Sequence, residues 1–202
     1  MTRFFHLDLP FWRFALNSLA LSVVGILPLL AVFVLLTSGF ASMLLGNGEA
    51  LSRFLRQVVT TGLPVVFVVN YLSLFLLALV AEGHISPGRA MVSDVLLRPV
   101  LFVALHGLSY ALSADWFDSF GGDRMLALRV VGPTLQRSWA FENISGVYLY
   151  ATLVAALPLQ LVALTRAGWA RGLGALGLAM LAFAVSVAMT TAMAGLMVSL
   201  LD

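Results

Sequence analysis

Five long stretches of the chain contain no charged residue, and apolar side chains occupy most positions in each. A helix needs about 20 mostly apolar residues to cross about 30 Å of hydrocarbon. The windows between charged residues are 14–48, 57–81, 99–114, 143–165 and 172–201. This pattern predicts an all-α integral membrane protein with about five transmembrane helices.

Four of the five windows are clear. In the first, the apolar run is too long for the core of a signal peptide, so residues 14–37 are expected to form a retained helix with a candidate kink at Pro28. The second span is expected to begin near Pro64, and the fourth contains Pro158. The fifth window, 172–201, is the longest, and a tilted helix accommodates its length.

The third window is shorter, with 16 residues. At about 1.5 Å per residue it extends only about 24 Å. The residues before it are apolar apart from Ser93 and Asp94, and Arg98 is expected to extend its charged end toward the membrane surface. A span over 93–114 is the favoured interpretation, and a re-entrant helix sheltered by the other spans is the alternative.

Two connections have a structure of their own. Segment 38–62 predicts a short helix lying in the membrane interface, with an ordinary solvated helix as the alternative. Its apolar face is formed by Leu51, Phe54, Leu55, Val58 and Val59. The longest connection, 115–142, is expected outside the hydrocarbon, broken at Gly121–Gly122 and Gly132–Pro133, with one short amphipathic piece between the breaks. No repeat or flexible linker divides the chain, so residues 1–202 are expected to form a single polytopic domain.

Composition agrees with a bilayer as the surrounding solvent. Hydrophobic residues make up 61% of the 202 residues and charged residues 10%, and the mean hydropathy is +1.04. Soluble domains are nearer half apolar and a quarter charged, and one of this size cannot hide so much apolar surface. The net charge of +2 is too small to indicate nucleic-acid binding.

The basic residues also bear on chemistry and location. There is no cysteine, and all eleven basic residues are arginine, which excludes thiolate chemistry, Schiff-base cofactors and a phosphate-binding lysine. Arginine without lysine, in an Ala- and Leu-rich chain, is typical of GC-rich bacterial genomes and favours a bacterial inner membrane. With five spans, six arginines fall on the side of the N-terminus, all in short segments near spans, and five on the other side. This distribution favours a cytoplasmic N-terminus.

The third span carries the most unusual polar pattern. His106, Ser109, Tyr110 and Ser113 recur at helical spacing and share one face, and Asp115 follows. Because polar groups in hydrocarbon are costly, this face is expected to point inward, with His106 within hydrogen-bond reach of another polar side chain. One interpretation is a proton relay, a buried ligand site or a quinone-type pocket. The favoured one is hydrogen bonding between packed helices.

Two further places hold candidate site residues. Glu142 and Asn143 stand where the fourth span begins. Glu142 is a candidate proton carrier or metal ligand, although a helix cap is the favoured interpretation. If the chain folds back on itself, His106, Asp115 and Glu142 converge. Asn70, in the second span, is expected to make a packing hydrogen bond. The three histidines lie on separate elements, so no metal site is predicted, and no cofactor can be assigned.

The fifth span has a stripe of small residues at intervals of three and four. Its members are Ala175, Ala179, Ala182, Ser186, Thr190 and Ala194. Small side chains let a second helix approach closely, either from this chain or from a partner membrane protein. The bulkier Leu176, Phe183, Val187 and Leu196 are expected to face lipid.

Three classes of function are compatible with these features. The favoured one is a non-catalytic structural or accessory subunit of a larger membrane complex, because no catalytic motif is present, the loops carry no soluble domain, and the fifth span offers a face for a partner. The alternatives are a small transporter or channel, with the His106–Tyr110 face and Asn70 lining a path, and an intramembrane enzyme acting on a lipid or quinone.

Overall fold

The computed structural model describes the backbone of residues 4–201 and the side chains of residues 4–199. Five helical segments in this part of the chain are long and apolar enough to cross a membrane, as predicted. They are α1 (Phe11–Leu36), α4 (Leu63–Ala81) with the helix leading into it, α5 (Pro87–Ala111), the pair α8 (Ile144–Ala151) and α9 (Leu153–Arg166), and α10 (Gly172–Leu201). The shorter elements are α2 (Phe40–Gly46), α3 (Gly48–Gln57), η1 (Val58–Gly62), α6 (Ala114–Asp118), α7 (Arg124–Gln136) and η2 (Ser138–Ala140).

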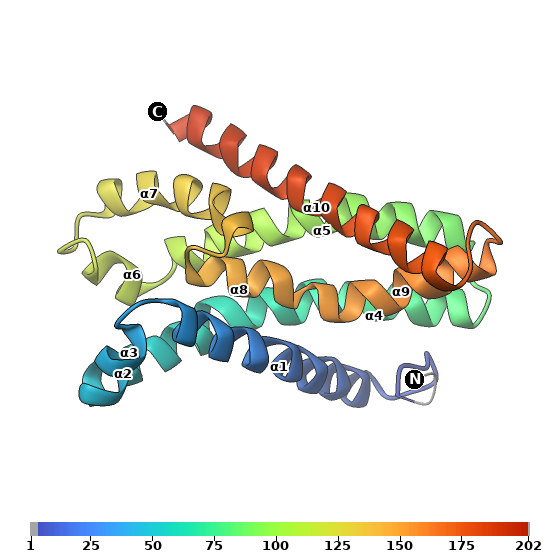
Figure 1. Ribbon diagram of the computed structural model, residues 1–202, viewed down its shortest axis with the longest axis horizontal. Helices are drawn as coiled ribbons and strands as arrows, with labels where there is room; N and C mark the ends of the chain where they lie inside the picture. The colour runs from blue at the N-terminus through green and yellow to red at the C-terminus, as the bar shows by residue number, and fades with distance from the viewer. Residues whose placement is uncertain (1–3, 202) are drawn as a thin grey trace.

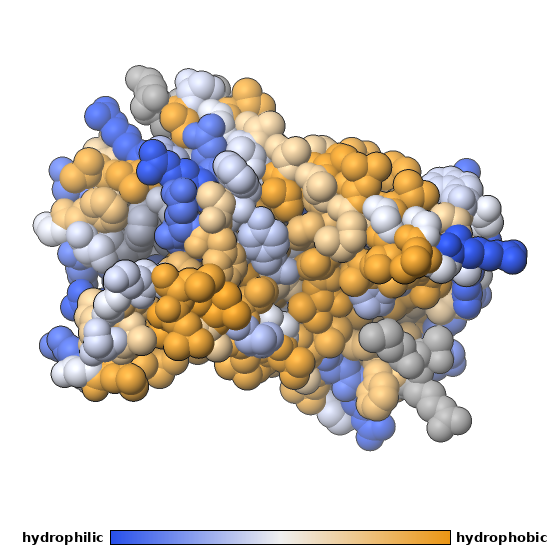
Figure 2. Space-filling model, in the orientation of Figure 1, coloured by the Kyte–Doolittle hydropathy of each residue, from blue (hydrophilic) through white to orange (hydrophobic). Residues whose placement is uncertain are grey.

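The spans run along the long axis of the molecule (Figure 1). In this view α1, α8 and α9 lie toward the front, α4 and α5 behind them, and α10 crosses above at an angle. The α4–α5 and α9–α10 connections lie at the same end as the N-terminus, whereas α2, α3, α6 and the C-terminus lie at the other. Apolar residues dominate the middle of the visible face and hydrophilic ones gather toward its ends (Figure 2). The arrangement is that of a helical bundle crossing a bilayer five times.

The third span is one continuous helix. α5 has 25 residues, so at about 1.5 Å per residue it is about 37 Å long, which is enough to cross. It begins earlier than the predicted 93–114, because Pro87 takes the first turn of the helix, where a missing N–H costs nothing. Pro99 lies inside it without ending it.

The fourth span, Ile144–Arg166, has a local irregularity in its middle. α8 ends at Ala151 and α9 begins at Leu153, whereas Thr152 between them keeps helical dihedral angles (φ −66°, ψ −17°) and an N–H bond to the Tyr148 carbonyl oxygen at 3.3 Å. We call this one-residue irregularity the break. Pro158 lies further along α9 and lacks the N–H that an uninterrupted helix would use. The start of α8 is capped by Asn143, whose side chain accepts from Gly146 N, and not by Glu142 as the sequence suggested.

The 115–142 connection is more ordered than predicted. α7 continues through Gly132 and Pro133, where a break was expected. A Cβ added at Gly132 would lie 2.7 Å from Val198 Cγ2 and 3.3 Å from its backbone nitrogen, so glycine here permits close packing of α7 against α10. Val131 and Leu135 are fully buried. Part of this connection therefore belongs to the bundle, and it is not a simple external loop.

The small-residue stripe of α10 is covered by the chain itself. All six of its residues are buried, and α10 packs against α5, α7 and α9. The expectation that Phe183 faces lipid is wrong, because it is 6% exposed. Phe183 precedes Thr190 by seven residues, which places both on the same side of the helix. Any partner that binds α10 must use a different face.

Candidate functional site

A line of buried residues winds slowly around α5, because a spacing of four residues exceeds one helical turn by about 40°. Asp94, Arg98, Phe102, His106 and Tyr110 recur every four residues, and each is at most 1% exposed. At about 1.5 Å per residue, the line covers about 24 Å, most of the thickness of the hydrocarbon. We call this line the polar seam, since only Phe102 interrupts its polar side chains.

A buried ion pair occupies the half of the seam nearer the start of α5. The guanidinium of Arg98 donates to the carboxylate of Asp94. Ser73 Oγ of α4 donates to Asp94 Oδ1 at 2.5 Å, and Gln160 Nε2 of α9 donates to Asp94 Oδ2 at 3.3 Å. Arg98 Nη1 also donates to the carbonyl oxygen of Thr152 at 2.9 Å, at the break in the fourth span. Arg98 therefore points into the bundle, and the expectation that it extends toward the membrane surface is wrong.

The other half of the seam is neutral. Ser145 Oγ of α8 lies 3.0 Å from His106 Nε2 and 2.8 Å from the Tyr110 hydroxyl, so one serine joins both residues. The His106 ring is 5.3 Å from the Tyr148 ring and 5.3 Å from the Phe102 ring. The prediction that His106 reaches another polar side chain is confirmed.

The remaining residues of the predicted third-span site are spread along its end. Ser109 donates to the carbonyl oxygen of Thr61, in the π-helical turn η1 before α4, at 3.1 Å. Ser113 caps α6 through its side chain. Asp115 lies 3.4 Å from Arg56 in an ion pair that joins α6 to α3.

The predicted convergence of His106, Asp115 and Glu142 is not observed. Asp115 pairs with Arg56, Glu142 is exposed, and no hydrogen bond or ion pair of the described residues joins the three. Asn70 makes the expected kind of packing contact, because its Nδ2 donates to Ser22 Oγ of α1 at 3.1 Å. The structure therefore joins His106 and Tyr110 and leaves the two carboxylates elsewhere.

Sequence reasoning missed the charged half of the seam. Asp94 and Arg98 lie within the predicted 93–114 span, but outside its charge-free window, and Arg98 was expected to extend toward the membrane surface. Their spacing held part of the missing signal, since Asp94 and Arg98 stand four residues apart and so share one side of a helix. Gln160 and Ser145 had no such signal, because their roles depend on contacts with a different span.

Several buried polar atoms of the interior have no hydrogen-bond partner within the described part of the protein. They are Asn70 Oδ1, Arg98 Nε, His106 Nδ1, Tyr148 OH and Gln160 Oε1. All five belong to the seam or to side chains on the helices packed around it. An unpaired polar atom in such surroundings is costly, and single water molecules commonly satisfy such atoms. The interior is therefore polar enough to hold isolated waters.

Metal coordination is not supported by the described residues, among which no group of three or more His, Asp or Glu side chains is arranged to hold an ion. The ionisable groups of the seam are Asp94, Arg98, His106 and Tyr110. Asp94, His106 and Tyr110 have groups that can take up or release a proton, whereas Arg98 stays protonated and supplies a fixed positive charge and hydrogen-bond donors.

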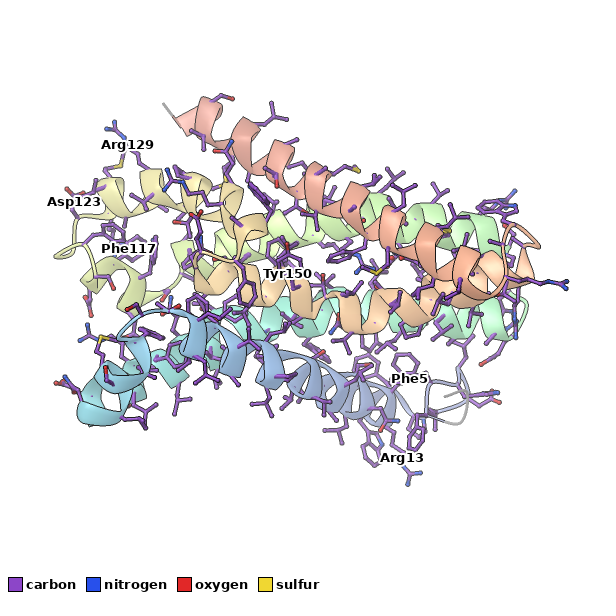
Figure 3. The ribbon with its side chains drawn as sticks, in the orientation of Figure 1. Phe5, Arg13, Phe117, Asp123, Arg129 and Tyr150 are labelled. Carbon is purple, nitrogen blue, oxygen red and sulfur yellow. The ribbon has the colours of Figure 1, made fainter. Side chains whose placement is uncertain are left out.

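Two apolar grooves lie on the outside of the bundle. One, of about 960 Å³, runs between α1 and the fourth span, and the other, of about 860 Å³, runs between α8 and α10. Trp139 and Tyr150 line both, and the Tyr150 hydroxyl donates to the Trp139 carbonyl oxygen at 2.6 Å. Figure 3 shows Tyr150 near the centre of the molecule, with Arg13 and Arg129 toward opposite ends. The grooves thus lie along the apolar middle of the bundle.

These features define the class of the protein as a polytopic α-helical membrane protein with a polar interior. No protein-family model, curated protein or solved structure matches the chain.

Proposed function

We propose that this protein is a small transport protein that conducts protons across the membrane along the polar seam of α5. The observation that carries the proposal is the run of buried ionisable and hydroxyl groups over most of one transmembrane helix. Ionisable residues inside a membrane are rare because they are costly, and they mark proton and ion pathways. A chain that needed only a stable bundle has no physical need for Asp94 and Arg98 there.

The close packing of the seam favours protons over larger solutes. Its residues are at most 1% exposed, so a hydrated metal ion or an organic solute does not fit without a large opening. A proton needs only a chain of groups that accept and release it. His106, Ser145 and Tyr110 form such a chain, with separations of 3.0 and 2.8 Å.

Interhelical hydrogen bonding explains only part of the seam. It accounts for Ser145 and Ser73, which link α5 to α8 and α4. It does not account for the Asp94–Arg98 pair, because replacing a buried ion pair by well-packed apolar residues is often neutral or stabilising. It also leaves the unpaired atoms Arg98 Nε and His106 Nδ1, which suit bound waters in a proton path.

Purified protein in liposomes tests the proposal. A potassium diffusion potential should drive proton uptake, followed with a trapped pH dye, faster than in empty liposomes. His106→Gln keeps a hydrogen-bonding side chain but cannot titrate, and it should reduce the rate by at least about 10²-fold, the lower end of what a positioned proton-transfer group contributes. His84→Gln, an exposed histidine outside the spans, is the matched control and should leave the rate unchanged.

A rate equal to that of empty liposomes would overturn the proposal. So would a His106→Gln variant that conducts as fast as the wild type. Tyr110→Phe and Tyr71→Phe form a second matched pair, since both remove one hydroxyl from a span and only the first removes a member of the seam.

A structural or accessory subunit of a larger membrane complex is the second candidate function, and the outer face of α10 supports it. Ala184, Ala188 and Ala192 are exposed and line the groove beside α8. Small residues on a lipid-facing helix permit a second transmembrane helix to approach closely. The occupant is then an apolar helix of a partner protein, bound through α10 at a face that the chain leaves open.

A photocrosslinking amino acid placed at Ala188 in native membranes tests this second function. A discrete protein adduct should form from Ala188 and not from Leu178, which is 40% exposed and lies outside the groove. The adduct should disappear when Ala184 is changed to Leu, which fills the groove. Crosslinks to lipid alone at both positions would contradict an accessory role through this face.

The orientation completes the proposal. A bacterial inner membrane with a cytoplasmic N-terminus is the location and orientation that we propose. Because Arg98 lies inside the bundle, five arginines remain on each side, and those on the N-terminal side stand in short segments near spans, where the positive-inside rule counts most. Reporter fusions after residues 86 and 168 should give cytoplasmic activity, and fusions after 46 and 120 should give the opposite. The reverse result would invert the orientation without changing the number of spans.

A further inference from the structure

Each half of the fourth span forms hydrogen bonds with a different half of the polar seam. α9 supplies Gln160, which donates to Asp94, whereas α8 supplies Ser145, which joins His106 and Tyr110. The break at Thr152 lies between these two groups of contacts. A movement of α8 relative to α9 would therefore change one half of the seam without directly changing the other.

Arg98 connects the charged half of the seam to this break. One end of its guanidinium is bound by Asp94, and Nη1 donates to the carbonyl oxygen of Thr152 at 2.9 Å. Thr152 is the N-cap of α9, and its carbonyl oxygen also accepts the first hydrogen bond of that helix, so Arg98 adds a second donor at the junction of α8 and α9. The side chain of Arg98 supplies that donor across 54 residues of sequence.

The position of Arg98 depends on the charge of Asp94. The side chains that hydrogen-bond to Asp94 are Ser73 from α4, Gln160 from α9 and Arg98 from α5 itself. From α10, Ser186 approaches the backbone of Val95 at 3.5 Å. Arg98 is the one charged partner among these described neighbours, so a proton on Asp94 would leave the guanidinium without a counter-charge in a region of low dielectric constant.

From these contacts we infer that Asp94 is a protonation-sensitive latch and that Arg98 is the positioning residue that transmits its state to the break in the fourth span. This inference rests on the proposed proton pathway and deepens it. With Asp94 ionised, Arg98 stays paired and holds the Thr152 carbonyl oxygen. When Asp94 takes up a proton, the ion pair is lost, Arg98 moves away, and α8 becomes free to change its angle to α9.

The consequence reaches the barrier within the seam. Phe102 separates the charged half from the neutral half and belongs to the same buried cluster as Val147, Tyr148 and Ala151 of α8. A change in the angle of α8 therefore moves the side chains that enclose Phe102. Proton uptake at Asp94 would in this way loosen the packing around Phe102, the apolar residue that separates the two halves of the seam. Entry of a proton at Asp94 would then be coupled to its transfer toward His106.

The absence of cysteine allows a direct test by spin labelling. A pair of cysteines introduced by Trp139→Cys and Thr165→Cys, both at exposed positions, brackets the broken span. The distance distribution between the two labels should shift as the pH of the lipid nanodiscs is lowered. A reference pair, Leu96→Cys with Leu108→Cys on the unbroken α5, should give the same distribution at every pH.

Asp94→Asn and Arg98→Lys then separate a latch from a merely structural role. Asp94→Asn should give the low-pH distance at all pH values, since its side chain is permanently neutral. Arg98→Lys keeps the charge but lacks the planar fork that reaches Asp94 and Thr152 together, so it should also lose the pH-dependent shift. The wild-type titration needs neither variant, so the test stands even if both fail to fold.

The outcomes distinguish this inference from the proposed function. A wild-type distance that does not change with pH, in protein that conducts protons, would overturn the latch and leave the pathway intact. A pH-dependent distance that persists in Asp94→Asn would overturn the role of Asp94. A pH-dependent distance that Asp94→Asn abolishes, in protein that does not conduct protons, would support the latch and overturn the pathway.

Discussion

At one end of α5, Asp94 and Arg98 carry opposite full charges and are held by polar groups from two other helices. At the other end, His106 and Tyr110 share the single hydroxyl of Ser145. Both halves are buried to the same degree, but their energetics differ. A buried ion pair is stable only while both charges are present, whereas neutral groups lose one modest hydrogen bond at a time. Removing one residue of the charged half should therefore cost most of the stability that this half contributes, whereas removing one residue of the neutral half should cost only a single hydrogen bond.

The largest effect is expected from breaking the ion pair on one side. Arg98→Met leaves the carboxylate of Asp94 buried without a counter-charge, which should lower the free energy of unfolding by about 3–5 kcal/mol. The double variant Asp94→Leu/Arg98→Met removes both charges and should be close to the wild type or more stable. Denaturation of the purified variants in detergent measures both. Equal losses in the single and double variants would show that the pair itself stabilises the fold.

The next effect concerns the support of the neutral half. A Cβ at Gly62, at the end of η1, would overlap the ring of Tyr148, which is fully buried and cannot move aside. Gly62→Ala should therefore lower the stability by about 3 kcal/mol, the upper end for overfilling a packed core. Gly46→Ala is the control, because a Cβ there meets no atom within 4 Å. Similar stability of the two variants would mean that the Gly62–Tyr148 contact is loose.

A smaller effect is expected behind the charged half, where α10 packs on α5. Ser186 is 1% exposed and its side chain lies against the backbone of Val95. Ser186→Leu should overfill this contact and cost about 2 kcal/mol. Leu176→Ala, at a position 40% exposed, should cost much less. Thermal stability in detergent compares them, and equal sensitivity would mean that the buried stripe is not a tight interface.

The smallest effect should come from the neutral half itself. Ser145→Ala removes the hydroxyl shared by His106 and Tyr110, and hydrogen bonds between membrane helices are each worth about 0.6–1.7 kcal/mol. A loss of about 1 kcal/mol is expected, against no measurable loss for Ser119→Ala, whose exposed hydroxyl bonds only to its own helical turn. A loss as large as that of Arg98→Met would remove the distinction between the two halves.

The five spans could be predicted from the sequence, because hydropathy and length are local properties of each segment. The inward face of the third span could also be predicted, since the spacing of His106 and Tyr110 on a helix decides that they share a side. Two boundaries failed. Gly132–Pro133 was expected to break the chain, but α7 continues through it, in close contact with α10. The third span was expected to begin at residue 93, but α5 begins at Pro87.

The candidate site was predicted only where its members lie on one helix. The sequence suggested that His106 would be joined by Asp115 and Glu142, but the structure joins it to Ser145. No spacing rule connects these residues, because they lie on different spans whose register is set by side-chain packing. The same holds for the two faces of α10, since only the positions of α5, α7 and α9 decide which stripe of small residues is covered.

The sequence by itself determined that the chain is a helical membrane protein, how many times it crosses, and which face of its third span is polar. Only the tertiary structure decided that Asp94 and Arg98 are interior residues, that Ser145 holds His106, and that the fourth span breaks at Thr152. The physical reason lies in the range of the interactions. Transfer of apolar residues into lipid is decided segment by segment, whereas Arg98 donates to the carbonyl oxygen of Thr152, 54 residues away, only after the helices have packed.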